Sequence, residues 1–157
     1  MKINLEINNT TESPITDGFF EAVAEKTFTE LKYDFLNPSA DGRKIGISIA
    51  LVAPAEIRKI NKEYRKYDSV TDILSFPEYE TAGQIEKVAV AKLDEELFLG
   101  ELILCYDDIK EYAQKEELDL EKEFAKVVSH GILHLLGFEH GEKMFAIEQS
   151  VADKFIK

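Results

Sequence analysis

Apolar residues recur along the chain with two different periods, which predict two kinds of element. In residues 2–8 apolar and polar positions alternate, as in a strand with one buried face. From Phe19 to about Phe35 they recur mostly at three- and four-residue steps, which is typical of an amphipathic helix, and Asp17 is placed to cap it. The same criteria predict strands over 2–8, 44–52, 71–76 and 99–105, and helices over 19–35, 55–64, 106–117, 118–136 and 142–156.

Residues 78–98 fit neither period. They carry six acidic and two basic residues and little clear pattern, so we expect a long hairpin or loop, with a strand tip at 88–91. The helix over 106–117 is expected to start at Asp107 or Asp108. The order of elements predicts an α+β (mixed α/β) fold, in which a single mixed sheet of about four strands is packed by about five helices, in one domain over residues 1–157.

Composition narrows the class of protein. Of the 157 residues, 45% are hydrophobic and 32% are charged, which is typical of a globular domain. No apolar run approaches the roughly 20 residues of a membrane helix, and the first residues lack the apolar core of a signal peptide. The single cysteine, Cys105, excludes an internal disulfide and is expected to be a small buried apolar residue. These features predict a cytoplasmic protein.

The charge balance is strongly acidic, with 31 acidic and 19 basic residues and a formal net charge of −12. Such a surface repels phosphate backbones at long range, so non-specific DNA binding is not expected. A local basic strip stands out at Arg58, Lys59, Lys62, Arg65 and Lys66. This strip either lines a groove for an anionic substrate or forms a solvated helix face near a helix C-terminus.

All three histidines of the chain lie within eleven residues, at His130, His134 and His140. His130 and His134 are one helical turn apart, so their side chains share a face about 5–6 Å apart. Gly137 can end the helix in a left-handed conformation and bring His140 toward the same point. Three imidazoles with an open fourth position are the composition of a catalytic zinc site. The sequence therefore predicts one Zn²⁺ per chain, bound on the C-terminal helix.

The spacing of the histidines equals that of the zinc-protease helix, His-Glu-x2-His-x2-Gly-x2-His, with one difference. The protease carries its general base, a glutamate, directly after the first histidine, where this chain has Gly131. Peptide hydrolysis by the usual route therefore lacks its base.

The roles of other polar residues near these motifs stay open. Asp72 and Ser75 either form a wall of the site or, in the case of Asp72, satisfy turn amides. Met144 and Glu148 share a helix face, and they either orient a ligand histidine or pack as ordinary helix residues.

The segment from His130 to His140 resembles the His-Gly-x-Leu-His-Leu-x-Gly-[Phe/Tyr]-Asp-His signature of the YbeY family of bacterial endoribonucleases and ribosomal RNA maturation factors. The resemblance extends to residues 61–65, 71–77 and 99–103, and covers about the last two thirds of the chain. The chain departs from the family pattern at Glu101 and Glu139, where the family usually has aspartate.

This resemblance implies a cytoplasmic, metal-dependent endoribonuclease that prefers single-stranded RNA and acts in small-subunit rRNA 3′-end maturation and ribosome quality control. It implies zinc bound by the three histidines and a functional arginine at Arg65. The implied partners are RNA, the small ribosomal subunit and its assembly factors, and neither DNA nor a membrane is expected. Two other functions stay open: a zinc hydrolase acting on a peptide or another non-RNA substrate, and a non-enzymatic ribosome-assembly module.

Overall fold

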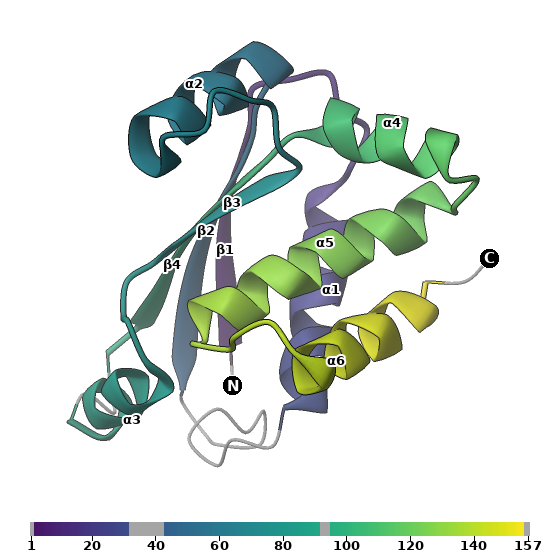
Figure 1. Ribbon diagram of the computed structural model, residues 1–157. Helices are drawn as coiled ribbons and strands as arrows, with labels where there is room; N and C mark the ends of the chain where they lie inside the picture. The colour runs from purple at the N-terminus through teal and green to yellow at the C-terminus, as the bar shows by residue number, and fades with distance from the viewer. Residues whose placement is uncertain (1, 32–42, 92–94, 156–157) are drawn as a thin grey trace.

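The computed structural model describes residues 2–31, 43–91 and 95–155 (Figure 1). Within these residues a four-stranded sheet has the order β1-β2-β4-β3. The strands are β1 (Lys2–Asn9), β2 (Lys44–Leu51), β3 (Ile73–Pro77) and β4 (Leu97–Leu104). The first three strands in this order run parallel, and β3 runs antiparallel to β4 at one edge. The prediction of a single mixed sheet within an α+β fold is therefore confirmed.

Six helices accompany the sheet in the described part of the chain, one more than predicted. They are α1 (Asp17–Glu30), α2 (Pro54–Arg65), α3 (Ala82–Ala91), α4 (Tyr106–Lys115), α5 (Leu120–Leu135) and α6 (Glu142–Asp153). None of the helices in residues 2–31, 43–91 and 95–155 has the length and apolar character needed to cross a membrane.

Helix α3 overturns the prediction of a hairpin or loop over 78–98 with a strand tip at 88–91. The side chain of Thr81 accepts a hydrogen bond from the Gln84 N–H (3.2 Å), which satisfies a donor at the start of the helix. Ile85 and Ala89, one turn apart, are both buried and form its inner face. Burial of one helical face, which the local pattern did not reveal, decides the structure here.

The helix boundaries differ from prediction mainly in their caps. Thr16, not Asp17, caps α1, because its hydroxyl accepts the Phe19 N–H (3.2 Å). Asp119 caps α5 by accepting the Lys122 N–H (2.9 Å), so this helix starts two residues later than predicted. Helix α4 starts after Cys105 without a side-chain cap, and the two aspartates expected to start it lie in its first turn. The predicted end of the first helix lies outside the described residues.

Successive side chains along each strand point to opposite faces of the sheet, and each face carries its own hydrophobic core. One face packs against α1 and α5, and α6 packs on these two helices (Figure 1). The opposite face carries a smaller cluster with α2, to which Ile57, Leu74 and Ile103 belong. On β3, Leu74 and Phe76 therefore lie toward α2, and Ile73 and Ser75 lie on the side of α5.

Cys105 lies directly after β4 and is fully buried in the smaller cluster. Burial raises the pKa of its thiol above the ordinary value, so the thiol stays protonated near neutral pH. The prediction of a small buried apolar residue is confirmed.

Candidate metal centre

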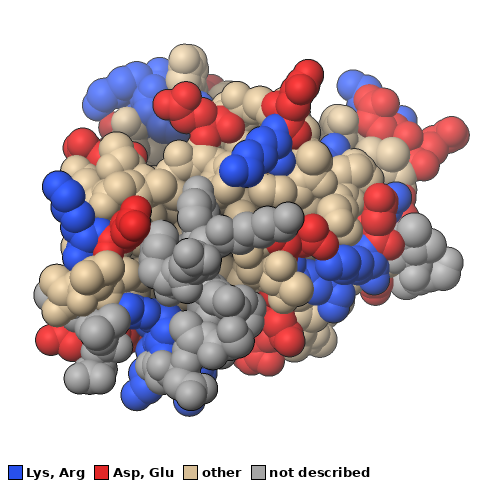
Figure 2. Space-filling view, turned by 90° about the horizontal axis from the view of Figure 1, so that it is seen from below, with Lys and Arg blue, Asp and Glu red and all other residues tan. Residues whose placement is uncertain are grey.

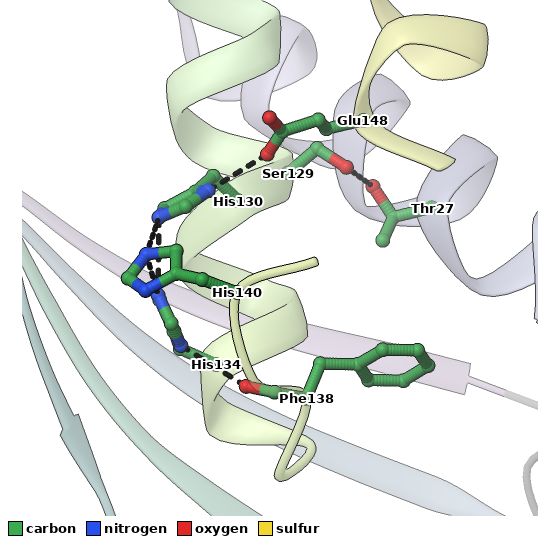
Figure 3. Close-up of polar contacts among 7 residues, drawn as sticks. All are labelled: Thr27, Ser129, His130, His134, Phe138, His140 and Glu148. Atoms are coloured by element: carbon green, nitrogen blue, oxygen red, sulfur yellow. Dashed lines mark hydrogen bonds and ion pairs between the residues drawn. The ribbon is translucent and has the colours of Figure 1, made fainter. Parts of the chain in front are cut away.

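Three imidazole rings converge at the C-terminal end of α5 (Figure 3). The Nε2 atom of His134 lies 3.0 Å from Nε2 of His130 and 3.1 Å from Nε2 of His140, and the third Nε2–Nε2 distance is 3.2 Å. Two nitrogens on one tetrahedral ion with bonds of about 2.0–2.1 Å lie about 3.3 Å apart. The spacing of the three donors thus fits a zinc-sized ion, and these residues could hold a metal ion.

In two of the three rings, Nδ1 is hydrogen-bonded to an acceptor. This contact bears on whether Nε2, which faces the centre, carries a proton or a lone pair. Nδ1 of His130 lies 2.7 Å from Oε2 of Glu148, and Nδ1 of His134 lies 3.2 Å from the carbonyl oxygen of Phe138. Both partners can accept, so a neutral ring that donates from Nδ1 presents the lone pair of its Nε2 to the centre. Two facing lone pairs at 3.0 Å repel each other. The arrangement therefore fits a cation between the rings.

Two close contacts fix the rotation of α5 about its axis. This rotation sets the direction in which the side chains of His130 and His134 point. The hydroxyls of Thr27 on α1 and Ser129 on α5, both fully buried, lie 2.9 Å apart (Figure 3). At Gly131, an added Cβ would lie 2.5 Å from Cδ1 of Ile73 and 2.9 Å from Cδ2 of Leu102. The helix therefore packs closely against the sheet at the position where the zinc-protease pattern has its glutamate, and an added side chain would have to displace the terminal methyl groups of Ile73 and Leu102.

The turn after α5 brings the third histidine back to the helix. Gly137 has a φ of 88°, in the left-handed region. Its N–H donates to the carbonyl of His134 (3.0 Å), and the N–H of Phe138 donates to the carbonyl of Leu133 (3.0 Å), which are the two bonds of a Schellman motif. The predicted left-handed end of the helix is confirmed. The same turn places the Phe138 carbonyl against His134 and returns the chain toward His140.

A buried carboxylate on α6 supports the site from behind. Glu148 is only 2% exposed, and its contact with Nδ1 of His130 joins α6 to α5. Of the two roles left open for Met144 and Glu148, Glu148 thus orients a histidine, whereas Met144 is fully buried in the main core.

Burial also sets the protonation of the central histidine. Desolvation lowers the pKa of His134, and the neighbouring rings of His130 and His140 lower it further. The hydrogen bond from His134 to the Phe138 carbonyl acts in the opposite direction but is the smaller effect. The imidazole is therefore neutral near pH 7, the form that binds metal ions.

A cavity of about 410 Å³ opens in front of the three histidines. Its opposite wall is formed by Arg65, at the end of α2, and by residues of β3 and the segment before it, namely Thr71, Asp72, Ile73, Leu74, Ser75 and Pro77. Asp72 serves both roles considered for it, because it lines the cavity and accepts the Ile73 N–H (2.8 Å). Ser75 also lines the cavity, as considered for it, whereas the lining residues Thr71, Ile73, Leu74 and Pro77 carry no motif that would have marked them in the sequence.

Of the five basic residues in the strip, Arg65 is the one that lines this cavity in the described part of the chain; Arg58, Lys59, Lys62 and Lys66 are exposed on or directly after α2 and lie outside the lining. The Arg65 guanidinium lies 5.4 Å from the centre of the Tyr67 ring. The cavity therefore combines three imidazoles with one cationic side chain.

The remaining basic side chains are partly paired. Asp68 accepts a hydrogen bond from Nε of Arg58 (2.8 Å) and lies 3.9 Å from Nζ of Lys62. The Arg58 guanidinium holds the pKa of Asp68 below its usual range. Nζ of Lys66 donates to the backbone carbonyl of Glu63. On the face shown in Figure 2, acidic and basic side chains are also interspersed, so that face carries no uniform charge.

Comparison with known proteins gives consistent matches. A family model described as endoribonuclease YbeY matches residues 6–155. The endoribonuclease YbeY of Sulfurihydrogenibium sp. is 34% identical over 146 residues, which cover 89% of this chain and 84% of the relative. That of Thermosipho melanesiensis is 30% identical over 154 residues, or 94% of each chain. A Thermotoga maritima protein solved in solution has a TM-score of 0.60 at 23% identity, covers 96% of this chain and 88% of its own, and supports the fold alone.

Proposed function

The chain belongs to the endoribonuclease YbeY family, and we propose that it is a metal-dependent endoribonuclease that cuts single-stranded RNA with one Zn²⁺ held by His130, His134 and His140. Family membership supports an endoribonuclease role and therefore an RNA substrate. The observation that carries the metal dependence is the triangle of Nε2 atoms, whose spacing fits a bound cation.

The chain's own residues account for most of the proposed catalysis. Zinc, when bound, would supply Lewis-acid chemistry and make a proton of water or a hydroxyl easier to remove at neutral pH. Three side chains converge in the described residues, which leaves room for a substrate oxygen beside them. Arg65 faces the same cavity, and its planar guanidinium can pair with two phosphate oxygens as negative charge develops on them. Glu148 keeps His130 in orientation.

The basic strip would serve the approach of the RNA. Arg58, Lys59 and Lys62 are exposed on α2, and Lys66 is exposed directly after the end of this helix that carries Arg65. In a chain with a net charge of −12, their local positive charge favours one direction of approach for a polyanion. We propose that they attract the strand toward the cavity, while Arg65 contacts the reacting phosphate.

We further propose a cellular role on the basis of the family resemblance of residues 61–65, 71–77, 99–103 and 130–140. In this role residues 1–157 act as a single hydrolase domain in the cytoplasm. The domain matures the 3′ end of small-subunit rRNA and takes part in ribosome quality control, with the small ribosomal subunit and its assembly factors as partners.

The test is to compare the wild-type protein with His134→Ala. Zinc content is measured by atomic absorption, and cleavage is measured on a single-stranded precursor carrying the rRNA 3′ end. We expect the variant to lose bound zinc and RNA cleavage together, because two imidazoles form a weaker site than three. Gln114→Ala, on an exposed part of α4, is the matched control and should retain both. Full cleavage by metal-stripped wild type would refute the metal mechanism.

The same purified protein can be used to test the two other functions left open by the sequence, a peptide hydrolase and a ribosome-assembly module. Casein replaces RNA to detect a peptide hydrolase, a function that Gly131 disfavours, because glycine cannot act as the general base that the glutamate of the zinc-protease pattern supplies. Binding of small ribosomal subunits without any cleavage of RNA would instead indicate an assembly module with a structural metal.

A further inference from the structure

Two tyrosine side chains at the end of α2 and directly after it are exposed to water. Tyr64 is 64% exposed and Tyr67 is 61% exposed, so most of each ring surface is free to meet a ligand. The Tyr64 ring packs edge-on against Phe76, on the side of β3 that faces α2. The Tyr67 ring instead lies 5.4 Å from the guanidinium of Arg65, which lines the cavity of the three histidines. Tyr67 therefore places an exposed aromatic surface beside a residue of the cavity wall.

The backbone that carries Tyr67 is held against α2 by contacts on both sides of it. The Tyr67 N–H donates to the carbonyl of Asn61 (3.4 Å), and Nδ2 of the buried Asn61 side chain donates to the Ser69 carbonyl (3.0 Å). Between these two contacts, Asp68 accepts a hydrogen bond from Nε of Arg58 (2.8 Å). The ring is thus presented by an ordered segment, so less conformational entropy is lost when a ligand stacks on it.

The surroundings of the Tyr67 ring are basic. Within residues 58–67 five side chains are basic, and Glu63 is the one acidic side chain. The cores of protein–protein interfaces are depleted in charged residues. Surfaces that bind single-stranded nucleic acids instead combine cationic groups, which follow the backbone of the strand, with aromatic rings on which bases stack. The basic surroundings of Tyr67 therefore favour a nucleic acid over a protein as the ligand of this ring.

We propose that Tyr67 stacks on one base of the RNA strand, beside the nucleotide whose phosphate Arg65 contacts, and that this stack selects single strands against duplexes. This inference rests on the proposed RNA substrate. In a duplex the bases are paired and stacked on one another, whereas the bases of a single strand can turn outward and stack on an aromatic side chain. Because every base has an aromatic face, the stack requires a base but no particular one.

The first experiment detects the stack by fluorescence. The chain contains no tryptophan, so Tyr67→Trp introduces a single indole, whose emission falls when a base stacks on it. Tyr64→Trp is the matched control, because Tyr64 is about equally exposed but packs against Phe76. Each Zn²⁺-loaded variant is titrated with a 2′-O-methyl RNA of mixed sequence, with its duplex and with the same backbone without bases.

We expect the single strand to quench the emission of the Tyr67→Trp variant. The duplex and the backbone without bases should quench it much less, and the Tyr64→Trp variant should respond weakly to all three. Equal quenching by the single strand and the backbone without bases would overturn the stack. Equal quenching by single strand and duplex would overturn the selection of single strands, and equal quenching in the two variants would show only general attraction to the basic strip.

A cleavage experiment tests whether the stack supports the reaction. A single-stranded RNA with one mapped cleavage site is compared with versions in which one base near that site is replaced by hydrogen. We expect one of these versions to raise KM about tenfold for the wild type, as is typical for the loss of one stacked base. Tyr67→Ala should raise KM for the complete RNA by a similar factor and make that base irrelevant, because the ring and the base act as a pair. Tyr67→Phe keeps the ring and should bind the complete RNA as the wild type does.

A role of Tyr67 in orienting Arg65 alone would give a different result. The loss in Tyr67→Ala would then fall on kcat rather than on KM, because Arg65 is proposed to act on the reacting phosphate. It would also be the same for the complete RNA and for every version that lacks a base. This pattern would overturn the proposal.

The outcomes also separate this proposal from the proposed function. Base-dependent quenching of the Tyr67→Trp variant without any RNA cleavage by the wild type would sustain the stack and refute the nuclease. Cleavage of RNA with a KM that depends neither on Tyr67 nor on any neighbouring base would sustain the nuclease and refute the stack.

Discussion

The two walls of the cavity are built in different ways. On the histidine wall the outer nitrogens of His130 and His134 are bonded, and the carboxylate behind them is buried. On the opposite wall Arg65 is exposed, and its neighbours pair with Asp68 in water. Buried polar contacts cost about 1–3 kcal/mol to leave unpaired, whereas exposed ion pairs contribute little. We therefore expect the histidine wall to control the metal and the fold, and the Arg65 wall to control the reaction alone.

The largest expected effect concerns the Arg65 wall. Arg65→Ala should lower kcat/KM for single-stranded RNA by about 100- to 1,000-fold, which is typical for the loss of one group that stabilises transition-state charge. Zinc content and thermal stability should not change, because Arg65 is exposed and distant from the core. Lys59→Ala, on the same helix, should lose only a few fold, and only at low salt. Wild-type cleavage by the Arg65 variant would remove this residue from the mechanism.

The second largest effect is expected on the histidine wall. Glu148→Ala removes the acceptor that orients His130, so zinc affinity should fall by about 10- to 100-fold. Glu148→Gln retains an acceptor oxygen and should lose less. Affinity is measured by competition with a chromogenic chelator, and circular dichroism confirms the fold. Unchanged affinity in a folded alanine variant would show that the histidines need no support from α6.

A third prediction asks how tightly α5 packs behind the histidines. Gly131→Ala places a methyl group against the terminal methyl groups of Ile73 and Leu102, which must shift, and should lower the free energy of unfolding by up to about 2 kcal/mol, once the gain of roughly 1 kcal/mol for alanine over glycine within a helix is set against the cost of overpacking. Gly141→Ala is the control, because an added Cβ there meets nothing within 4 Å. Urea denaturation of both variants gives the comparison. Equal stability of the two would mean that α5 can move away from the sheet at no cost.

The smallest effect concerns an exposed contact outside the cavity, which we compare with the buried contacts of the histidine wall. A hydrogen bond from Lys154 lowers the pKa of Glu30, which ties the end of α6 to α1. Because the folded-state pKa lies below that of the unfolded chain, this contact stabilises the protein near pH 7. Its contribution is lost as the pH falls through the lowered pKa. The melting temperatures of wild type and Glu30→Gln should therefore differ slightly at pH 7 and converge in acid. A constant difference would contradict the assignment.

Features that depend only on residues within one or two helical turns of each other were predictable from the sequence. The helical spacing of His130 and His134 and the left-handed end at Gly137 are local properties, and the structure contains both. Helix α3 was not predictable, because its apolar run suits a strand as well as a helix. Its conformation depends on partners distant in sequence, such as the Arg43 side chain, which donates to the carbonyl of Ala89.

The wall opposite the histidines depends on strand order, which no local pattern reveals. Strand β4 lies between β2 and β3, so β3 becomes an edge strand, and several of its residues line the cavity. The bond between Glu148 and His130 joins residues 18 positions apart. Helical spacing suggested that bond as one of two possibilities, and the packing of α6 on α5 decides it.

The exposed backbone of β3 also bears on the solubility of the protein. An unpaired strand edge can pair with the edge of another molecule and begin aggregation. Here the strand is five residues long, Pro77 ends it without a donor, and Asp72 places a carboxylate at its start. These features oppose edge-to-edge association of two molecules through β3, so the sheet can keep this strand unpaired at one edge.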